Sequence, residues 1–221
     1  MPRKVRVGVI GSGGIAQAAH IPNYQKLPAV EVVAVCDVKP DVAKAAAEKF
    51  KVPHVFTDWR ELLNLHDIDA VSVCTPNAFH LEPTLASLAA GKHVMVEKPI
   101  GLNAKEGLAM CRAAKKARRL LAVGHHTRFD PAVETLKRFV DAGEVGRPYY
   151  ARAQTMRRRG IPSWGSFISK KLNGGGPLID IGVHIIYSAL YLLGFPRPVS
   201  DSGKAYTLFG NRSDVVPGGW G

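Results

Sequence analysis

A glycine-rich turn near the N-terminus carries the residue pattern of a dinucleotide-binding loop. Residues 11–16 have the form G-x-G-x-x-A and lie between an apolar run, 5–10, and a helix-like segment, 15–26. The first glycine permits a tight turn, the second lets a pyrophosphate approach the backbone, and the small sixth residue allows close packing of helix against strand. Free N–H groups at the start of the helix would bind the phosphates. The residues expected to bind the dinucleotide here are Gly11, Ser12, Gly13, Gly14, Ile15 and Ala16.

An acidic residue follows the second apolar run, where a ribose-binding carboxylate is expected. Asp37 comes directly after residues 32–36, about 20 residues beyond the glycine turn. A carboxylate here would bind the ribose hydroxyls and repel the 2′-phosphate of NADP by a few kcal/mol at an effective dielectric constant of about 20. Lys39, two residues further on, weakens that repulsion. The pattern therefore favours NAD, with NADP the less favoured cofactor.

Two more motifs follow apolar runs, and both are expected at the cofactor because ligands of open α/β sheets bind outside the carboxyl ends of the strands. The first is C-T-P-N, in which we expect Thr75, Pro76 and Asn77 to face the cofactor, with His80 three residues later. Alternatively, Pro76 and Asn77 only cap the next helix. The second motif is Glu97-Lys98-Pro99.

Lys98 is placed to bind a substrate hydroxyl and to stabilise a developing alkoxide. A lysine at the end of a strand is more often an ordinary solvated side chain, so its position alone leaves both interpretations open.

An acid and a histidine share one face of a predicted helix after a run of glycines. Asp180 and His184 are four residues apart and follow Gly174–Gly176, so they are neighbours on the helix. Because burying either group unpaired is costly, they need partners. They could be two metal ligands or a mutually satisfied core pair, but neither interpretation explains the glycine run. No third ligand is evident, and we expect no metal.

The elements that must position these residues alternate along the first half of the chain. Continuous apolar runs separated by helical patterns predict a doubly wound parallel sheet. Strands are expected at 5–10, 32–36, 70–74, 93–96 and 120–123, and helices at 15–26, 41–50, 81–90 and 104–118. We take residues 1–128 as an NAD(P)-binding Rossmann domain.

Residues 129–221 predict the beginning of an α+β domain. Residues 149–155 and 204–209 have strand-like patterns, and residues 177–193 form a long apolar helix. We expect the longest apolar run, 185–195, to be a buried helix, because no apolar stretch approaches the ~20 residues that span a bilayer. This part is shorter than the usual domain of about 100–150 residues and ends in a loop-like sequence, so we expect the chain to be incomplete.

Composition excludes several classes of protein. The three cysteines are too scattered for a disulfide framework or a zinc site, and the N-terminus lacks a secretory signal, so we expect a cytoplasmic protein. The net charge of +12 includes basic clusters at 112–119 and 157–159. No nucleic-acid-binding motif accompanies them. We interpret them as solvated surface and expect neither nucleic acid nor membrane as a partner.

These motifs in this order resemble the Gfo/Idh/MocA family, named for glucose–fructose oxidoreductase, inositol dehydrogenase and a rhizopine-catabolism protein. The similarity rests on the three motifs above, on residues 123–129 (V-G-H-H-T-R-F) and on the G-G-G-x-x-x-D-x-x-x-H stretch at 174–184. It spans nearly the whole chain. It implies a Rossmann domain followed by a C-terminal domain whose mostly antiparallel sheet often mediates a homo-oligomer, such as a dimer or tetramer.

The resemblance also implies an activity: reversible hydride transfer between a sugar or cyclitol hydroxyl and a nicotinamide. By position, Lys98 would polarise the reacting hydroxyl, Asp180 would orient the substrate and His184 would be the general acid/base. Glu97 would lie at the cofactor, and the Lys98–Pro99 bond would be cis. The residues expected on the substrate side are His125, Arg128, Arg157 and Trp164. Trp164 would stack on a sugar ring or, equally, pack structurally.

Two departures from the family pattern limit the analogy. Tyr187 stands where the family often has an acid three residues after the histidine, and the family's second domain extends well beyond residue 221. Two further functions therefore stay open: a redox-assisted glycosidase that uses NAD without net release of NADH, and a cofactor-binding fragment without activity.

Overall fold

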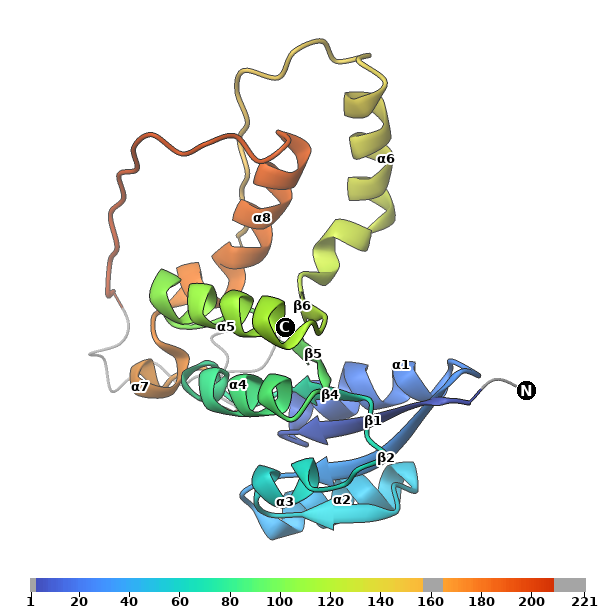
Figure 1. Cartoon of the computed structure of the whole chain (residues 1–221). Helices are drawn as coiled ribbons and strands as arrows, with labels where there is room; N and C mark the ends of the chain where they lie inside the picture. Colours follow the sequence, from blue (N-terminus) through green and yellow to red (C-terminus); the bar gives the residue numbers. More distant parts are fainter. Residues whose placement is uncertain (1–2, 157–164, 209–221) are drawn as a thin grey trace. The chain divides into compact units, whose positions relative to one another are not determined.

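The structure, a computed structural model, describes residues 3–156 and 165–208. The chain divides into two compact units (Figure 1). The first comprises Met1–Gly124 and Ser169–Gly175, and the second comprises His125–Ile168 and Gly176–Gly221. A segment far along the sequence thus belongs to the N-terminal unit.

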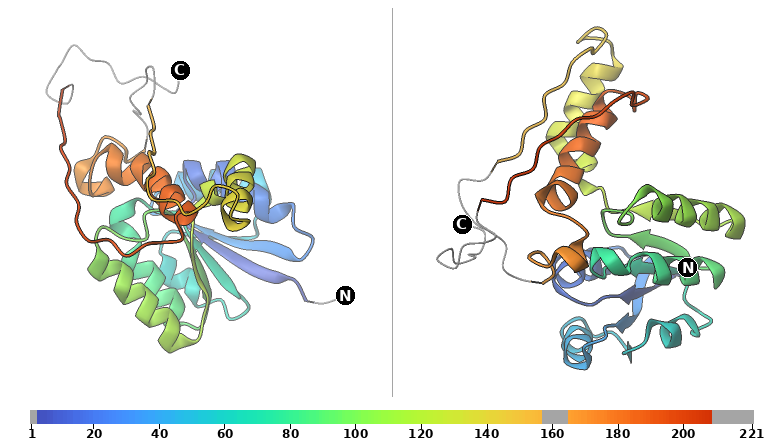
Figure 2. Two further views of the ribbon diagram at one scale, coloured as in Figure 1. Left: turned by 90° about the horizontal axis from the view of Figure 1, so that it is seen from above. Right: turned by 90° about the vertical axis from the view of Figure 1, so that its left-hand side faces the viewer.

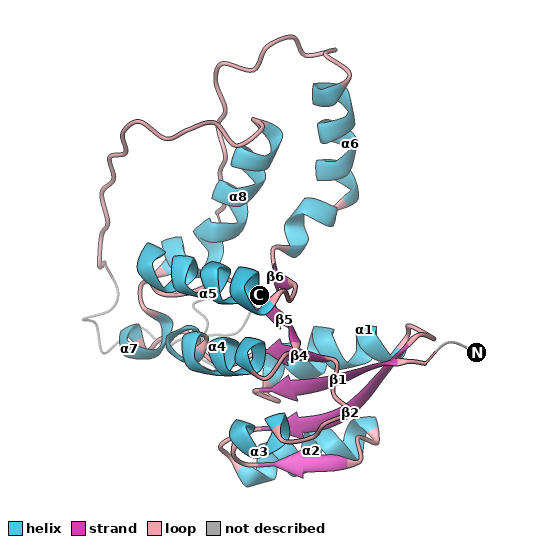
Figure 3. Cartoon of the chain, in the orientation of Figure 1, coloured by secondary structure: helices cyan, strands magenta, loops and turns pink. Residues whose placement is uncertain are grey.

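A six-stranded, wholly parallel sheet forms the centre of the first unit (Figure 3). Its order is β3-β2-β1-β4-β5-β6, so the direction of winding reverses between β1 and β4. The strands are β1 (Val5–Ile10), β2 (Val30–Cys36), β3 (His54–Phe56), β4 (Ala70–Val73), β5 (His93–Val96) and β6 (Leu121–Val123). The predicted doubly wound parallel sheet is confirmed.

Helices cover both faces of this sheet and explain why its strands read as continuous apolar runs. Side chains of α1 and α2 pack in one core cluster, and those of α3, α4 and α5 pack in the other. Val9, Val33 and Val73 of the central strands are completely buried. The helices of this unit are α1 (Ile21–Gln25), α2 (Pro40–Phe50), α3 (Trp59–Leu63), α4 (Leu81–Ala89), α5 (Ala104–Ala117) and α7 (Lys170–Asn173).

The helix after the glycine turn contains a π-helical segment, Ala16–His20, before α1. A π-helical turn inserts an extra residue, and such segments are frequent at functional sites. The five strands and four helices expected in this unit are present within one or two residues, whereas β3, α3 and α7 were not predicted. Each has only three to five residues, too few to show a period.

In the second unit, the described residues form helices joined by extended segments (Figure 2). They are α6 (Pro131–Asp141), α8 (Val183–Leu192), a 3₁₀ turn (His126–Phe129) and a π-helical segment (Leu178–Gly182). The strand predictions for 149–155 and 204–209 are wrong for the described residues, which are irregular at 149–155 and 204–208; Phe209 lies outside them. A strand needs a partner for its backbone N–H and C=O groups, and the described residues of this unit contain none. The predicted antiparallel sheet is therefore not seen.

The prediction of a buried apolar helix at 185–195 is also wrong in part. The helix is present as α8, but none of its residues is buried, and Ile186 is 48% exposed. An apolar helix becomes buried only when other elements surround it, and α6 is the helix that packs beside it.

The expectation that no stretch approaches membrane-spanning length needs a correction too. Counted as one helical stretch, Lys170–Leu192 is long and apolar enough by length and composition, with a mean hydropathy of 1.2. A core helix of a soluble protein passes the same test, so this is weak evidence for a membrane span.

The end of β1 approaches the end of β4 too closely for any side chain at position 11. Gly11 has φ +85°, and a Cβ there would lie 2.7 Å from the carbonyl carbon of Cys74 and 2.7 Å from the nitrogen of Thr75. Two separate constraints, the backbone conformation and the missing space, thus require glycine.

We expect Gly11→Ala to lower the free energy of unfolding by at least about 1–2 kcal/mol, the cost of a left-handed conformation for an L-residue. Denaturant unfolding measures this change. Gly13→Ala is the matched control, because a Cβ at Gly13 meets nothing within 4 Å, and its stability should stay within about 0.5 kcal/mol. Equal losses in the two variants would contradict the steric explanation.

Candidate functional site

The candidate cofactor residues of the first unit follow the carboxyl ends of neighbouring strands. In a sheet of this order, the crevice for a ligand opens where the winding reverses, here between β1 and β4. Within two residues of the ends of β1, β2, β4, β5 and β6 lie Gly11, Asp37, Thr75, Glu97 and Gly124, respectively.

The glycine turn has room and a donor for a phosphate group. The Ser12 hydroxyl is completely buried and has no hydrogen-bond partner among the residues that the structure describes. Positions 13 and 14 have no atom within 4 Å of where a Cβ would lie. Because an unpaired buried hydroxyl is costly, a ligand oxygen near Ser12 would relieve that cost. The turn therefore fits a dinucleotide pyrophosphate.

The Asp37 carboxylate holds the glycine turn against the end of β2. One oxygen accepts the backbone N–H of Ser12 at 3.1 Å, and the other accepts that of Lys39 at 3.0 Å. A carboxylate offers about four acceptor positions, so each oxygen can accept one more hydrogen bond from a ribose hydroxyl. Asp37 thus has a structural contact that the sequence did not reveal, and capacity for the predicted one.

The C-T-P-N segment connects to α7 of the same unit. Asn77 Nδ2 donates to both the backbone oxygen and Oδ1 of Asn173, each at 3.0 Å. Thr75 Oγ1 donates to the Phe79 carbonyl at 3.0 Å, and Pro76 lies between the two, half-buried. No side chain caps the 3₁₀ turn Asn77–Phe79 or α4, so the alternative interpretation as a helix cap finds no support.

His80 connects this segment to the turn that carries Lys98. Its Nδ1 lies 2.8 Å from the Pro99 carbonyl, its Nε2 lies 2.9 Å from the Thr75 carbonyl, and its ring is completely buried. Burial lowers the pKa of His80 because it disfavours the charged ring, and the two carbonyls oppose that effect. The ring contacts backbone on both sides.

A buried polar network surrounds Glu97. Oε1 contacts Nε2 of His20 at 2.7 Å, and Oε2 accepts the backbone N–H of Lys98 at 3.1 Å. Nδ1 of His20 lies 2.8 Å from the Ser72 hydroxyl, which also contacts the Tyr24 hydroxyl at 3.1 Å. Burial alone would raise the pKa of Glu97, but the hydrogen bond with His20 and the backbone N–H of Lys98 outweigh it, so the pKa is lowered.

Lys98 is half-buried between Glu97 and Pro99. The Lys98–Pro99 peptide bond is cis, as the family resemblance predicted. Nucleophilic chemistry by the nearby thiols is disfavoured, because burial raises the pKa of Cys36 to about 12 and also raises that of Cys74.

Asp180 and His184 lie on successive helical segments of the second unit. Asp180 is buried in the π-helical segment, and His184 is half-buried in the first turn of α8. His184 packs edge-on against the ring of His126, with centroids 4.7 Å apart. Among residues 3–156 and 165–208, no three His, Cys, Asp or Glu side chains cluster as metal ligands.

Two of the predicted substrate-side residues contact the same tyrosine. The ring of His125 stacks on Tyr187 with centroids 4.1 Å apart, and Arg128 Nη1 donates to the Tyr187 hydroxyl at 3.1 Å. The Arg128 guanidinium also lies over the ring of Tyr191, 4.6 Å from its centroid. The other two predicted residues, Arg157 and Trp164, lie outside the described residues.

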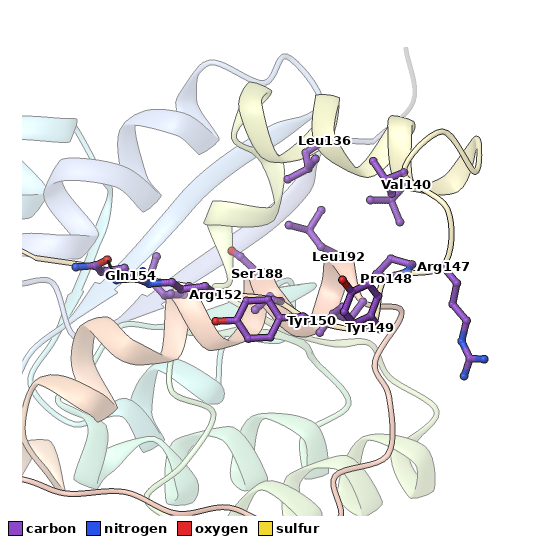
Figure 4. A pocket seen from close by; sticks show the side chains of 16 residues that line it. Leu136, Val140, Arg147, Pro148, Tyr149, Tyr150, Arg152, Gln154, Ser188 and Leu192 are labelled. Carbon is purple, nitrogen blue, oxygen red and sulfur yellow. Dashed lines mark hydrogen bonds between the residues drawn. The ribbon is translucent and has the colours of Figure 1, made fainter.

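A cavity of about 610 Å³ opens elsewhere in the second unit, between α6, α8 and residues 147–154 (Figure 4). Leu136, Val140 and Leu192 line it, with Ser188 at its polar end, while the Arg147 side chain extends away. None of the candidate catalytic or cofactor residues lines this cavity.

Comparison with known protein families covers both units. The model described as "Oxidoreductase family, NAD-binding Rossmann fold" matches residues 5–125, and the one described as "GFO/IDH/MocA C-terminal domain" matches residues 133–215. The chain belongs to the Gfo/Idh/MocA family.

Several Gfo/Idh/MocA relatives act on sugars or cyclitols, as their names state. The chain is 41% identical to D-glucoside 3-dehydrogenase of Escherichia coli (strain K12), over 94% of this chain and 59% of that protein. It is 33% identical to myo-inositol 2-dehydrogenase of Thermotoga maritima, over 86% of this chain and 55% of that protein. Levoglucosan dehydrogenase, solved with NADH and levoglucosan, superposes with a TM-score of 0.72 at 31% identity, over 87% of this chain and 55% of that one. The chain thus spans just over half the length of these relatives.

The sequence did not indicate which residues outside the motifs hold the motif residues in place. His20, Ser72 and Tyr24 surround Glu97, Asn173 holds Asn77, and Tyr187 joins His125 to Arg128. One signal was present: Ser72 lies within an apolar strand and His20 one position before the buried Ile21, where polar side chains need partners.

Acid stability tests the Glu97 network. A carboxyl whose folded pKa is lowered stabilises the fold above its unfolded pKa of about 4.3, and this contribution is lost as the pH falls through the folded pKa. We expect Glu97→Gln to destabilise the chain at pH 7 and less so at pH 3–4, as measured by denaturant unfolding at each pH. Glu31→Gln removes an equal charge from an exposed position. A deficit for Glu97→Gln that is constant with pH would contradict the assignment.

Proposed function

We propose that this protein is an NAD-dependent oxidoreductase that transfers a hydride between a sugar or cyclitol hydroxyl and the nicotinamide. The glycine turn carries this proposal, because the buried Ser12 hydroxyl, unpartnered among the described residues, and the open space at Gly13 and Gly14 fit a pyrophosphate. Family membership and the relatives that act on D-glucosides, inositols and levoglucosan support the substrate class.

The residues that would hold the dinucleotide come from three strand ends. Ser12 and the backbone of Gly13 and Gly14 would bind the pyrophosphate, and Asp37 would accept hydrogen bonds from the adenosine ribose. Asp37 also favours NAD over NADP, because its charge repels a 2′-phosphate. Thr75 and Pro76 would lie beside the nicotinamide half.

The reacting groups would be Lys98, Asp180 and His184. A bound nicotinamide supplies the hydride acceptor. Lys98 binds the reacting hydroxyl and stabilises negative charge on its oxygen, Asp180 orients the substrate, and a ring nitrogen of His184 accepts the hydroxyl proton. An imidazole suits this role because its ordinary pKa lies near neutral pH. His125 and Arg128 contribute to the substrate side.

A second function, cofactor binding without turnover, is favoured by one observation. The chain spans 55–59% of the length of the relatives compared above. If part of the substrate site lies outside residues 1–221, these residues alone would bind NAD but would not turn over a substrate. A redox-assisted glycosidase is a third possibility, distinguished by cleavage of a glycoside without net formation of NADH.

Cofactor preference tests the role of Asp37. We expect calorimetry to show tighter binding of NAD than of NADP. Asp37→Asn, which keeps an acceptor oxygen but removes the charge, should reduce the ratio of the two affinities at least about tenfold, or 1.4 kcal/mol. Stronger binding of NADP by the unchanged chain would contradict NAD as the cofactor.

Turnover tests the reacting groups. We expect NAD-dependent oxidation of D-glucosides or inositols, followed by absorbance of NADH. His184→Ala should lower kcat by about 10²–10⁴-fold, the usual contribution of a general base, and Lys98→Ala should abolish turnover. NAD affinity measured by calorimetry should change little in His184→Ala.

Three outcomes separate the proposed functions. Full turnover in either variant would overturn the assignment of the reacting groups. Binding of NAD without turnover of any polyol would favour the second function. Cleavage of a glycoside without a stoichiometric NADH signal would favour the third.

A further inference from the structure

Two buried histidines contact the residues on either side of Lys98. Nε2 of His20 lies 2.7 Å from Oε1 of Glu97, and Nδ1 of His80 lies 2.8 Å from the carbonyl oxygen of Pro99. His20 is 8% exposed and His80 is completely buried. Neither ring is open to solvent.

The other nitrogen of each ring contacts a neighbouring element at the same edge of the sheet. Nδ1 of His20 contacts the hydroxyl of Ser72 in β4 at 2.8 Å, and Nε2 of His80 contacts the carbonyl of Thr75 at 2.9 Å. His20 itself ends the π-helical segment after the glycine turn, and Thr75 packs against Gly11. Each ring therefore links the predicted cofactor elements to the turn that carries Lys98.

The Glu97 side chain is held on all sides. Its two oxygens contact His20 and the N–H of Lys98. A Cβ at Gly124 would lie 2.9 Å from Oε1, so the absence of a side chain there leaves room for the carboxylate. The backbone N–H of Glu97 donates to the Val73 carbonyl at 2.9 Å. Little freedom remains for the backbone from which the Lys98 side chain extends.

One assignment of protons satisfies the whole network around His20. The Tyr24 hydroxyl donates to Ser72, Ser72 donates to Nδ1 of His20, and Nε2–H of His20 donates to the Glu97 carboxylate. Each group then has a partner, as buried polar groups require. Such a network specifies one arrangement of the groups in it.

We propose that His20 and His80 are positioning residues that fix the placement of the Lys98 side chain from the elements predicted to bind the cofactor. This inference rests on the proposed function for the catalytic meaning of Lys98. The placement itself is a property of the first unit, so it can be tested without substrate.

Paired substitutions separate the two contacts of each ring. An asparagine places its amide near the position of Nδ1, and a glutamine places its amide near that of Nε2. His20→Gln and His80→Asn thus keep the contacts to Glu97 and Pro99, whereas His20→Asn and His80→Gln lose them and keep the contacts to Ser72 and Thr75. Each member of a pair loses one of the two contacts that the ring makes.

The readout is the NMR resonance of Lys98 after ¹³C-dimethylation of the lysines in the full chain, assigned with Lys98→Arg. We expect His20→Asn and His80→Gln to shift this resonance, and His20→Gln and His80→Asn to leave it near its original position. Where the chain turns over a polyol, kcat should be at least tenfold lower in the first two variants than in the second two, with KM within threefold.

Gly124→Ala provides a test that leaves both histidines intact. Its Cβ would displace the Glu97 carboxylate, so the Lys98 resonance should shift as it does in His20→Asn. This variant keeps the test decisive if a histidine variant fails to fold.

Two results would overturn the proposal: equal shifts in both members of each pair, or an unchanged Lys98 resonance in folded His20→Asn, His80→Gln and Gly124→Ala. The proposed function fails separately, if Lys98→Ala retains full turnover.

Discussion

The backbone at the end of β1 lies against the backbone at the end of β4, and the first unit is organised around this approach. Gly11 leaves β1 in a left-handed conformation, with the carbonyl carbon of Cys74 only 2.7 Å from where a Cβ would lie. This contact occurs where the winding of the sheet reverses, so it places the glycine turn beside the C-T-P-N segment. Asp37 then attaches the end of β2 to the glycine turn, and His80 attaches the turn at Pro99 to the C-T-P-N segment.

The sequence predicts the first unit well because a strand buried on both faces of a parallel sheet appears in the sequence as a continuous apolar run. Strands that are buried over most of their length, such as β1, β2 and β4, are apolar at nearly every position. The motifs that follow them are constrained by backbone geometry and phosphate chemistry. Short elements such as β3 and α3 have too few residues to show such a pattern. α6 was also missed, although its apolar residues Val133, Leu136 and Val140 recur at helical spacing.

The supporting contacts of the site could not be derived in the same way. His20 and Glu97 are 77 residues apart, and so no local pattern indicates that they meet. His80 was expected at the cofactor because of its place in the chain, whereas its ring nitrogens contact two backbone carbonyls. In the second unit, strand-like alternation at 149–155 was a poor guide, because a strand depends on a partner that alternation does not reveal.

The hydrogen bonds from Asn77 to Asn173 have a consequence for how this architecture can be divided or recombined. Residues 169–175 belong to the N-terminal unit although 44 residues of the other unit precede them, from His125 to Ile168. The chain therefore passes between the units three times, and no single cut yields the complete nucleotide-binding module. A gene fusion or domain exchange at residue 124 would separate Asn77 from its partner and leave a buried amide unsatisfied. A fragment that contains the complete first unit must therefore also contain residues 125–168, which lie between its two parts.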